Sequence, residues 1–344
     1  MLNQTDLEGM TPFRIVAIGG GTGLSTLLHG LKRYAAVEPR EVEITAVVTV
    51  TDDGGSSGRL RRDFDVLPPG DIRNCMVALS EDEALLSKLF QYRFSEGRGL
   101  KGHSFGNLFL TALTNLTGDF AQAVKVSSEV LASLGRIYPS TNTNVVLEAE
   151  LEDGSMVLGE TKIGKSRSRI RRIQLQPRNC KPLPDTLAAI EEADLITLGP
   201  GSLFTSLIPN LLVDGMAAAI HRSRALKAYF VNLMWQPGET IGFRASDHVE
   251  AIHRHAGLPL IDVAVVNTRP ISPRQRRKYA AQKVRSVLND VDRLAELGLQ
   301  VMTADLLAPG DIVRHDPRAS AEVALQLAKR GRTARRKVRV LGEA

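Results

Sequence analysis

The sequence predicts an α/β protein built around a mostly parallel sheet, and three observations carry that prediction. Short, nearly continuous apolar runs recur along the chain, as is typical of parallel strands buried on both faces. Helical patterns alternate with these runs, which favours right-handed βαβ units. Two of the runs end directly in glycine-rich turns, at the place where open parallel sheets bind their ligands.

The first unit is a strand over 13–18, the turn Gly19-Gly20-Gly21-Thr22-Gly23 and a helix expected from about Ser25 to Tyr34. Glycine lets a backbone approach a ligand closely, and a helix N-terminus offers free N–H groups to an anion. The turn is not a Walker A loop, because no Gly-Lys-Ser or Gly-Lys-Thr follows it, and it is not the usual G-x-G-x-x-G, because Leu24 occupies the third glycine position. We predict a phosphate cradle here, with a tight βα turn that holds no ligand as the alternative.

The second apolar run, 42–51, reads as the next buried strand and ends at Thr51-Asp52-Asp53. Two adjacent carboxylates at the carboxyl end of a strand suit either Mg²⁺ or the hydroxyl groups of a ribose or sugar. The alternative is a solvated turn in which Asp52 or Asp53 caps the following helix.

Two helices are expected after this turn. Asp71 suits the N-cap of a helix that reaches about Ser80, with Arg73 and Asn74 in its first turn. Arg73 is a candidate phosphate ligand through bidentate hydrogen bonds, or else a partner in a surface ion pair. A further helix is expected over 83–94.

A third glycine-punctuated helix start carries His103 and Asn107. A histidine between glycines at a helix start suits a general acid or base, or a neutral donor to a phosphate or carbonyl. A purely structural histidine is the alternative.

The second half of the chain repeats the strand–turn–helix arrangement. A β-rich insertion is expected at about 145–177, with a hairpin turn at Asp153-Gly154. A buried strand over 194–198 then ends at Gly199-Pro200-Gly201-Ser202. Two such units in one sheet would hold a diphosphate from both sides. The remaining elements are expected as helices at 184–193, 203–212, 246–255, 273–288 and 317–327, and strands at 228–233 and 263–268.

Composition limits the class of protein. The chain holds two cysteines without a CxxC motif, no apolar leader and no run of roughly 20 apolar residues, so we expect a cytoplasmic protein without a membrane span. Seven Lys and Arg side chains face one Glu over 329–344, so this stretch carries the whole formal charge of +6. We predict a loose lead-in at 1–12, a single α/β domain at 13–328 and a basic, disordered tail at 329–344.

The aromatic content of the chain is only 5%, so we do not expect a surface on which the bases of a nucleic acid stack.

The assembled motifs resemble the YvcK/GlmR proteins, the gluconeogenesis factors of the CofD-like superfamily. The matching stretches are Gly19–Ser25, Val48–Arg59, Pro69–Asn74, Gly102–Asn107, Gly199–Ser202 with Ile208–Leu212, and Pro237–Thr240. This resemblance implies a Rossmann-like three-layer fold and binding of a UDP-sugar, chiefly UDP-N-acetylglucosamine. It also implies a regulator of carbon flow into peptidoglycan precursors, and hence of cell shape, during growth on gluconeogenic carbon sources.

The resemblance implies further site residues and partners. Arg314-His315-Asp316 and Tyr279 match residues that lie at the family's nucleotide-sugar site. A glucosamine-6-phosphate synthase is implied as a partner, and we also expect a homo-oligomer. The expected ligand-binding residues are Gly19, Gly20, Gly21, Thr22, Gly23, Thr51, Asp52, Asp53, Arg73, Asn74, His103, Asn107, Gly199, Gly201, Ser202, Tyr279 and Arg314.

Two functions follow from these residues. The first is a non-catalytic regulator that binds a nucleotide sugar and needs no cofactor. The alternative is a transferase of the 2-phospho-L-lactate (CofD) or nucleotidyl type, with Mg²⁺ held by Asp52 or Asp53 and with Asp53 or His103 as the catalytic group.

Overall fold

A computed structural model describes residues 11–81 and 85–342 of the chain. Its main sheet has seven strands in the order β10-β9-β8-β7-β1-β2-β3, and all neighbouring pairs are parallel. The strands are β1 (Phe13–Gly19), β2 (Val42–Val48), β3 (Gly135–Pro139), β7 (Leu195–Leu198), β8 (Leu226–Phe230), β9 (Val263–Asn267) and β10 (Gln300–Ala304). The prediction of a mostly parallel sheet is confirmed.

The strand order reverses at β1. The chain builds β2 and β3 on one side of β1 and later adds β7, β8, β9 and β10 on its other side. In open α/β sheets the crevice at such a reversal is the expected ligand site. The two glycine-rich turns follow β1 and β7, the two strands that flank this point.

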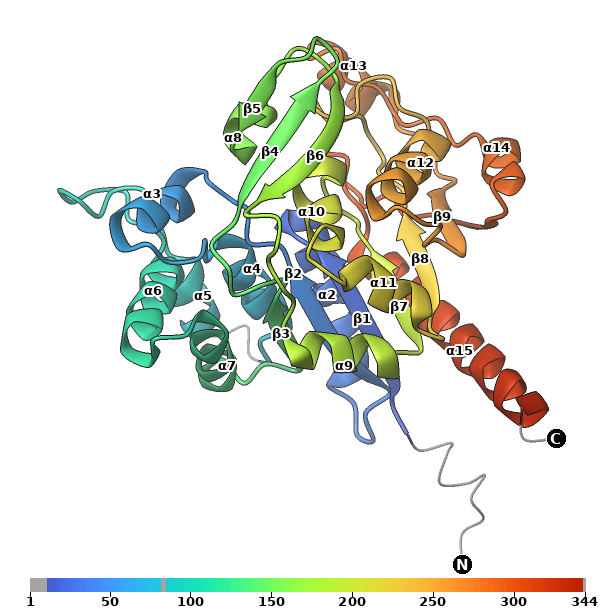
Figure 1. Cartoon of the computed structure of the whole chain (residues 1–344), viewed down its shortest axis with the longest axis horizontal. Coiled ribbons are helices and arrows are strands. Elements are labelled where there is room, and N and C mark those ends of the chain that lie inside the picture. The colour runs from blue at the N-terminus through green and yellow to red at the C-terminus, as the bar shows by residue number, and fades with distance from the viewer. Residues whose placement is uncertain (1–10, 82–84, 343–344) are drawn as a thin grey trace, which may run out of the picture.

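Helices cover both faces of the sheet and complete three layers. Figure 1 shows α9 (Pro184–Glu192), α10 (Ile208–Leu211) and α11 (Met216–Arg222) in front of the sheet, with α2 (Gly21–Ala35) behind it. On the side of α2, α4 (Gly70–Leu79) and α15 (Pro317–Gly342) pack against it. The other helices are α3 (Gly55–Phe64), α5 (Leu85–Gln91), α6 (Phe105–Thr117), α7 (Phe120–Val130), α12 (Ala245–Ala256), α13 (Pro273–Ala280) and α14 (Val291–Glu296), and a π-helical turn, η1 (Leu203–Leu207), precedes α10.

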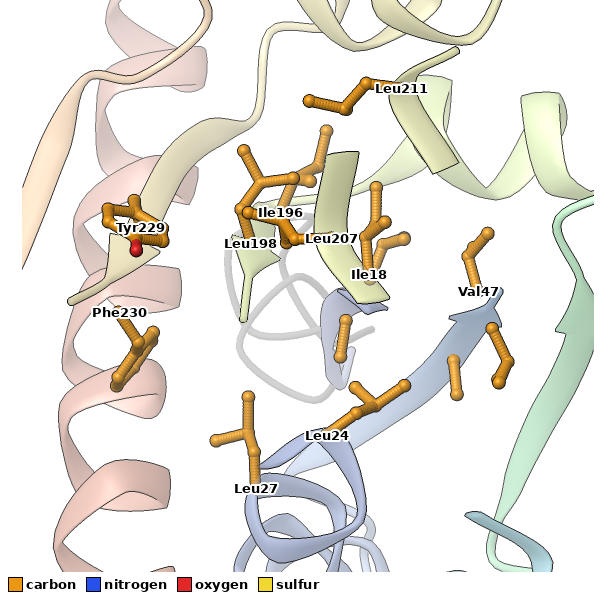
Figure 2. Packing of buried hydrophobic residues seen from close by; sticks show 14 of the residues in the cluster. Ile18, Leu24, Leu27, Val47, Ile196, Leu198, Leu207, Leu211, Tyr229 and Phe230 are labelled. Atoms are coloured by element: carbon orange, nitrogen blue, oxygen red, sulfur yellow. The ribbon is translucent and has the colours of Figure 1, made fainter. Parts of the chain in front are cut away.

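The core forms where apolar side chains of both helical layers meet the central strands. Figure 2 shows Leu24 and Leu27 of α2 on one side of Ile18 and Leu207 of η1 on the other. All four side chains are at most 1% exposed. Burial of each such side chain stabilises the fold by roughly 1.5–3 kcal/mol, so this packing fixes β1 and the turn that follows it.

Several element boundaries differ from the predicted ones. Helix α2 begins at Gly21 rather than at Ser25, because the glycines themselves form its first turn after the extended Gly20. Helix α4 begins at Gly70, so the prediction that Asp71 is the N-cap is wrong. The helices expected over 83–94 and 273–288 are shorter, as α5 and α13, and residues 83 and 84 lie outside the described residues.

The β-rich insertion is a separate three-stranded antiparallel sheet in the order β5-β4-β6. Its strands are β4 (Val146–Leu151), β5 (Met156–Leu158) and β6 (Ile170–Gln176), and the short helix α8 (Glu160–Ile163) lies between β5 and β6. Buried and half-buried residues alternate along β4, as expected for a strand with one face toward the core. This small sheet lies above the carboxyl ends of the central strands (Figure 1).

The basic segment after residue 328 is not a disordered tail as far as the structure describes it. It continues α15, which runs without a break to Gly342. The Arg332 guanidinium forms an ion pair with Asp194 at 2.5 Å and stacks on the Phe13 ring at 4.1 Å. The Arg332 guanidinium also donates to the Thr11 and Pro12 carbonyls, while residues 1–10 of the predicted lead-in lie outside the described residues.

Within the described ranges no single helix is both long and apolar enough to cross a membrane. One pair, Leu203–Leu211 with Met216–Arg222, meets the length and composition requirement only when taken together across a 76° bend.

We predict that Arg332→Ala lowers the free energy of unfolding by about 3 kcal/mol, because it leaves the Asp194 carboxylate, in a side chain only 6% exposed, without its cation. Urea denaturation followed by circular dichroism measures this loss. Arg330→Ala, which removes an exposed hydrogen bond to Gln300, is the control and should cost less than about 1 kcal/mol. Equal costs for the two variants would contradict a structural role of the Arg332 pair.

Candidate functional site

Two glycine turns touch each other at the carboxyl ends of β1 and β7. A Cβ atom on Gly23 would lie 2.3 Å from the Pro200 carbonyl oxygen, a distance that real side chains do not adopt. A Cβ atom on Gly201 would lie 3.3 Å from the Gly20 oxygen. Gly21 and Gly199 have φ values of +62° and +74°, which favour glycine. The glycines at these positions therefore bring two backbones into direct contact.

The N-terminus of α2 at this contact has no side-chain cap. Its 15 residues place the positive end of a helix dipole and free N–H groups at the first turn. The Gly21 N–H donates to the Asp71 carboxylate, while burial and the nearby Asp52 raise the pKa of Asp71 to about 6. The N–H groups of the first turn therefore favour an oxyanion as acceptor, and the Asp71 carboxylate already accepts from one of them.

The second turn is held by the loop that follows β8. The Gln236 side chain donates to Ser202 Oγ at 2.6 Å and accepts from the Leu203 N–H at 3.3 Å. Glu239 accepts from the Phe204 N–H at 3.0 Å and from Thr205 Oγ1 at 3.1 Å, and its burial raises its pKa to about 7. Sequence analysis identified 237–240 as a matching stretch, but it did not predict that Glu239 holds the turn after β7 in place.

A cavity of about 210 Å³ opens between the two turns. Of the expected site residues it brings together Gly20, Gly21, Thr22, Gly23, Gly201, Ser202 and Arg314. Its further lining includes Thr26, Pro200, Ser206, Asn232, Leu233, Met234, Gln236, Val313 and His315. Gly19 and Gly199 are buried behind it as the last residue of β1 and the first residue after β7.

The loop before α15 supplies the wall opposite the glycine turns. Arg314 is exposed, and its guanidinium has no hydrogen bond or ion pair among the described residues. Tyr279 does not line the cavity, but its hydroxyl accepts from the Val313 N–H at 3.1 Å and so positions the residue beside Arg314. Asp316 accepts from the Ala319 N–H at 2.9 Å and caps α15.

His315 is a neutral member of this wall. Its Nε2 lies 3.2 Å from the Val231 carbonyl oxygen, so this nitrogen carries the proton and Nδ1 is the acceptor. Burial lowers the pKa of His315 to about 4. Arg314 is therefore the cation of the cavity wall at neutral pH.

The loop after β2 serves chiefly to join elements. The Thr51 hydroxyl donates to the Thr205 carbonyl at 3.3 Å, and Asp52 Oδ1 accepts from the Gly54 N–H at 2.8 Å. Asp53 Oδ1 accepts from both the N–H and the hydroxyl of Thr161 in α8, which ties this loop to the small sheet. Burial and the nearby Asp52 raise the pKa of Glu160, also in α8, to about 9.

These carboxylates do not fit a magnesium site. The Oδ1 atoms of Asp52 and Asp53 accept hydrogen bonds from backbone N–H groups of the protein. In the part of the chain that the structure describes, no three His, Cys, Asp or Glu side chains converge in a way that could hold a metal ion. We therefore derive no reaction step through Mg²⁺ at this loop.

His103 and Asn107 lie apart from the cavity, between α3 and α6. His103 is 6% exposed, and its Nδ1 lies 3.0 Å from Ser56 Oγ. Burial and the nearby Arg59 lower the pKa of His103. Asn107 is 2% exposed and donates to Ser57 Oγ at 3.5 Å. Both side chains contact α3 rather than the glycine turns.

Arg73 and Asn74 line a neighbouring cavity, which shares Thr22 and Thr26 with the first. The Arg73 guanidinium donates to Asn74 Oδ1 at 2.7 Å. The expected residues are thus distributed over one cavity between the turns, a second cavity beside it and a set of bracing contacts.

The family model for 2-phospho-L-lactate transferase CofD matches residues 15–307 of this chain. A gluconeogenesis factor from Halalkalibacterium halodurans is 48% identical over 313 residues, which cover 91% of this chain and 95% of the relative. The gluconeogenesis factor of Bacillus subtilis is 47% identical over 317 residues, 92% of this chain and 98% of the relative. The chain belongs to the CofD-like gluconeogenesis factor family.

A solved structure supports the same family and fold. The crystal structure of a UPF0052 family member from Bacillus halodurans matches with a TM-score of 0.87 and 46% identity, over 92% of this chain and 100% of that chain. The Rossmann-like three-layer fold expected of a CofD-like gluconeogenesis factor is therefore confirmed, and so is the resemblance on which that expectation rested.

We predict that Gly23→Ala destabilises the protein by about 1–3 kcal/mol, because the added methyl group forces the two turns apart at Pro200. Thermal and urea unfolding measure the loss. Gly19→Ala is the matched control in the same turn, since its Cβ would meet only Leu24 Cβ at 3.6 Å, and it should cost less than about 1 kcal/mol. A Gly23→Ala variant as stable as Gly19→Ala would show that the turns are not in contact.

His315 gives a prediction on pH. Its folded-state pKa of about 4 lies below the value of 6.5 for an unperturbed histidine, so the unfolded state takes up the proton first as the pH falls. The stability that neutral His315 contributes is complete above pH 6.5 and declines toward pH 4. We expect the difference in unfolding free energy between wild type and His315→Asn to shrink by about 2 kcal/mol between pH 7 and pH 5.

Urea titrations at both pH values measure this difference, and His29→Asn is the control for an exposed histidine. Parallel pH curves for wild type and His315→Asn would exclude a buried neutral imidazole at this position.

Proposed function

We propose that this protein binds a UDP-sugar, UDP-N-acetylglucosamine in particular, and regulates carbon flow into cell-wall precursors in the cytoplasm. The observation that carries the proposal is the pair of glycine turns in backbone contact, with the N-terminus of α2, whose N-cap residue Gly20 has no side chain, beside them and Arg314 on the facing wall. A gluconeogenesis-related role is supported by the names of the relatives at 47% and 48% identity.

A diphosphate suits the charge of this cavity. Free N–H groups at a helix start and an unpaired guanidinium both favour oxyanions. In the described residues that line the cavity there is no Asp or Glu to repel one. The hydroxyl of Ser202 and the amides of Asn232 and Gln236 also line the cavity and suit the hydroxyl groups of a ribose or sugar.

The same lining supports binding rather than group transfer. His315 donates through Nε2 to a carbonyl and has no carboxylate partner among the described contacts, so it is not arranged as an activated base. The candidate catalytic groups Asp53 and His103 are engaged with Thr161 and Ser56, outside this cavity. We propose that ligand occupancy is read by a protein partner, such as a glucosamine-6-phosphate synthase, and that the regulator acts as a homo-oligomer.

The first test is isothermal titration with UDP-N-acetylglucosamine, with and without Mg²⁺, beside GDP and NAD. We expect binding of the UDP-sugar that does not depend on Mg²⁺. Arg314→Ala should weaken it at least about tenfold, because Arg314 is the one Lys or Arg among the described residues that line the cavity. Arg318→Ala, an exposed arginine at the start of α15, is the matched control and should change the affinity less than about twofold.

Two outcomes would overturn the proposal. Unchanged affinity in Arg314→Ala would place the ligand elsewhere. Mg²⁺-dependent binding of GDP without a UDP-sugar signal would instead favour a CofD-type transferase.

A further inference from the structure

A second and larger cavity, of about 610 Å³, lies along the exposed face of α2. Helices α4 and α5 form its opposite wall, and the start of α15 closes one end. It meets the cavity between the glycine turns at Thr22 and Thr26, which line both. From the sequence we expected no second site here, and we counted Arg73 and Asn74 among the ligands of the UDP-sugar.

The lining of this cavity is strongly cationic. It carries Lys32, Arg73, Lys88 and Arg93, and among the described residues that line it there is no Asp or Glu. In the described part of the chain, none of these four cations has a carboxylate oxygen within 4.0 Å. Four cations that gather around one cavity, with no carboxylate among the described residues of its lining, give that cavity a positive potential that suits an anion.

Neutral oxygens hold three of these cations in place. Lys32 Nζ donates to the Ser80 carbonyl at 3.1 Å, and Arg93 donates to the Gly102 carbonyl at 2.6 Å. Arg73 donates to Asn74 Oδ1 at 2.7 Å. Each cation is thus oriented by the protein while its charge remains unneutralised at short range.

The Arg73 side chain packs closely against α6. A Cβ atom on Gly106 would lie 2.7 Å from the Phe90 carbonyl oxygen and 2.9 Å from two Arg73 side-chain carbons, so this glycine accommodates both neighbours. Burial and the like charge of Arg93 lower the pKa of Arg73. The negative charges of Asp71 and Asp52 raise it and offset part of this effect. Arg73 Nε is buried and has no acceptor among the described residues. An anion in the cavity would relieve the repulsion between the two guanidinium groups.

We infer that this cavity binds a phosphorylated, hydroxylated metabolite of the sugar phosphate class. A phosphate monoester carries close to two negative charges at neutral pH, and its oxygens accept from Arg and Lys together. No Phe, Tyr or Trp is among the described residues of the lining, so apart from the imidazole of His29 and the guanidinium groups the cavity offers little surface on which a nucleobase could stack. The hydroxyl groups of Ser25 and Thr26 and the amide of Gln91 suit a polar, hydroxylated body.

This site goes beyond the proposed UDP-sugar site and does not depend on it. Because Thr22 and Thr26 belong to both cavities, each ligand contacts the first turn of α2 from a different side. Occupancy of one cavity would then change the affinity of the other, and any such coupling is reciprocal.

The test is calorimetric titration of the full chain with glucose 6-phosphate, inorganic phosphate, glucose and AMP. We expect glucose 6-phosphate to bind and glucose not to bind. The double variant Lys88→Gln/Arg93→Gln should weaken glucose 6-phosphate at least about tenfold, since it removes two of the four unpaired cations. Lys88→Gln alone, at an exposed position on α5, should weaken it several-fold and guards against a folding defect at Arg93.

Arg98→Gln removes an exposed arginine outside the cavity and is the matched control, with an expected change below about twofold. Arg314→Ala should leave glucose 6-phosphate binding intact, which separates this site from the UDP-sugar site. Three results would overturn the inference: no binding of any phosphorylated probe at millimolar concentration, equal binding of glucose, or tighter binding of AMP that Lys88→Gln weakens. Full retention of affinity in the double variant would overturn it as well.

Discussion

The direct contact of two backbones at the switch point of the sheet is the constraint on which the candidate site depends. Gly23 and Pro200 meet where no side chain fits, and this contact fixes the distance between the turns that follow β1 and β7. Asn210 strengthens it, because its amide donates to Gly19 O at 3.3 Å and to Ser206 O at 2.8 Å. The binding geometry therefore rests on main-chain atoms, which hold their positions better than flexible side chains do.

Around that contact, polar side chains form hydrogen bonds that join the turns and the loop after β2 to more distant elements. Glu239 and Gln236 hold the N–H groups of η1, and Asp53 joins the loop after β2 to α8 in the small sheet. Glu160, Asp71 and Glu239 all have raised pKa values because burial disfavours their charged forms. An acid with a raised pKa is more readily protonated, so these three groups carry less negative charge near the first turn of α2 than ordinary carboxylates would.

Sequence alone predicted the parallel sheet, the two glycine turns and their meeting, because apolar runs and glycine clusters report local burial and backbone freedom. It could not distinguish a ligand carboxylate from a bracing one: Asp53 looked like a metal or sugar ligand, yet its partner Thr161 is more than a hundred residues away in sequence. The same limit applies to the segment after residue 328, whose Arg and Lys residues looked solvated. Its order comes from Asp194 and Phe13, which only the folded sheet brings to it.

The place of α15 in the sheet also bears on how the chain reaches its fold during synthesis. This helix packs on β1, β7 and β8, so the strand that begins at Phe13 is covered by a helix that begins only at Pro317. Until α15 emerges, the part of this face that α15 covers in the folded protein stays open to solvent and to other nascent chains. Contacts of such long sequence separation form slowly and leave intermediates prone to association. The covering of β1, β7 and β8 on this face is therefore completed only after α15 has been synthesised.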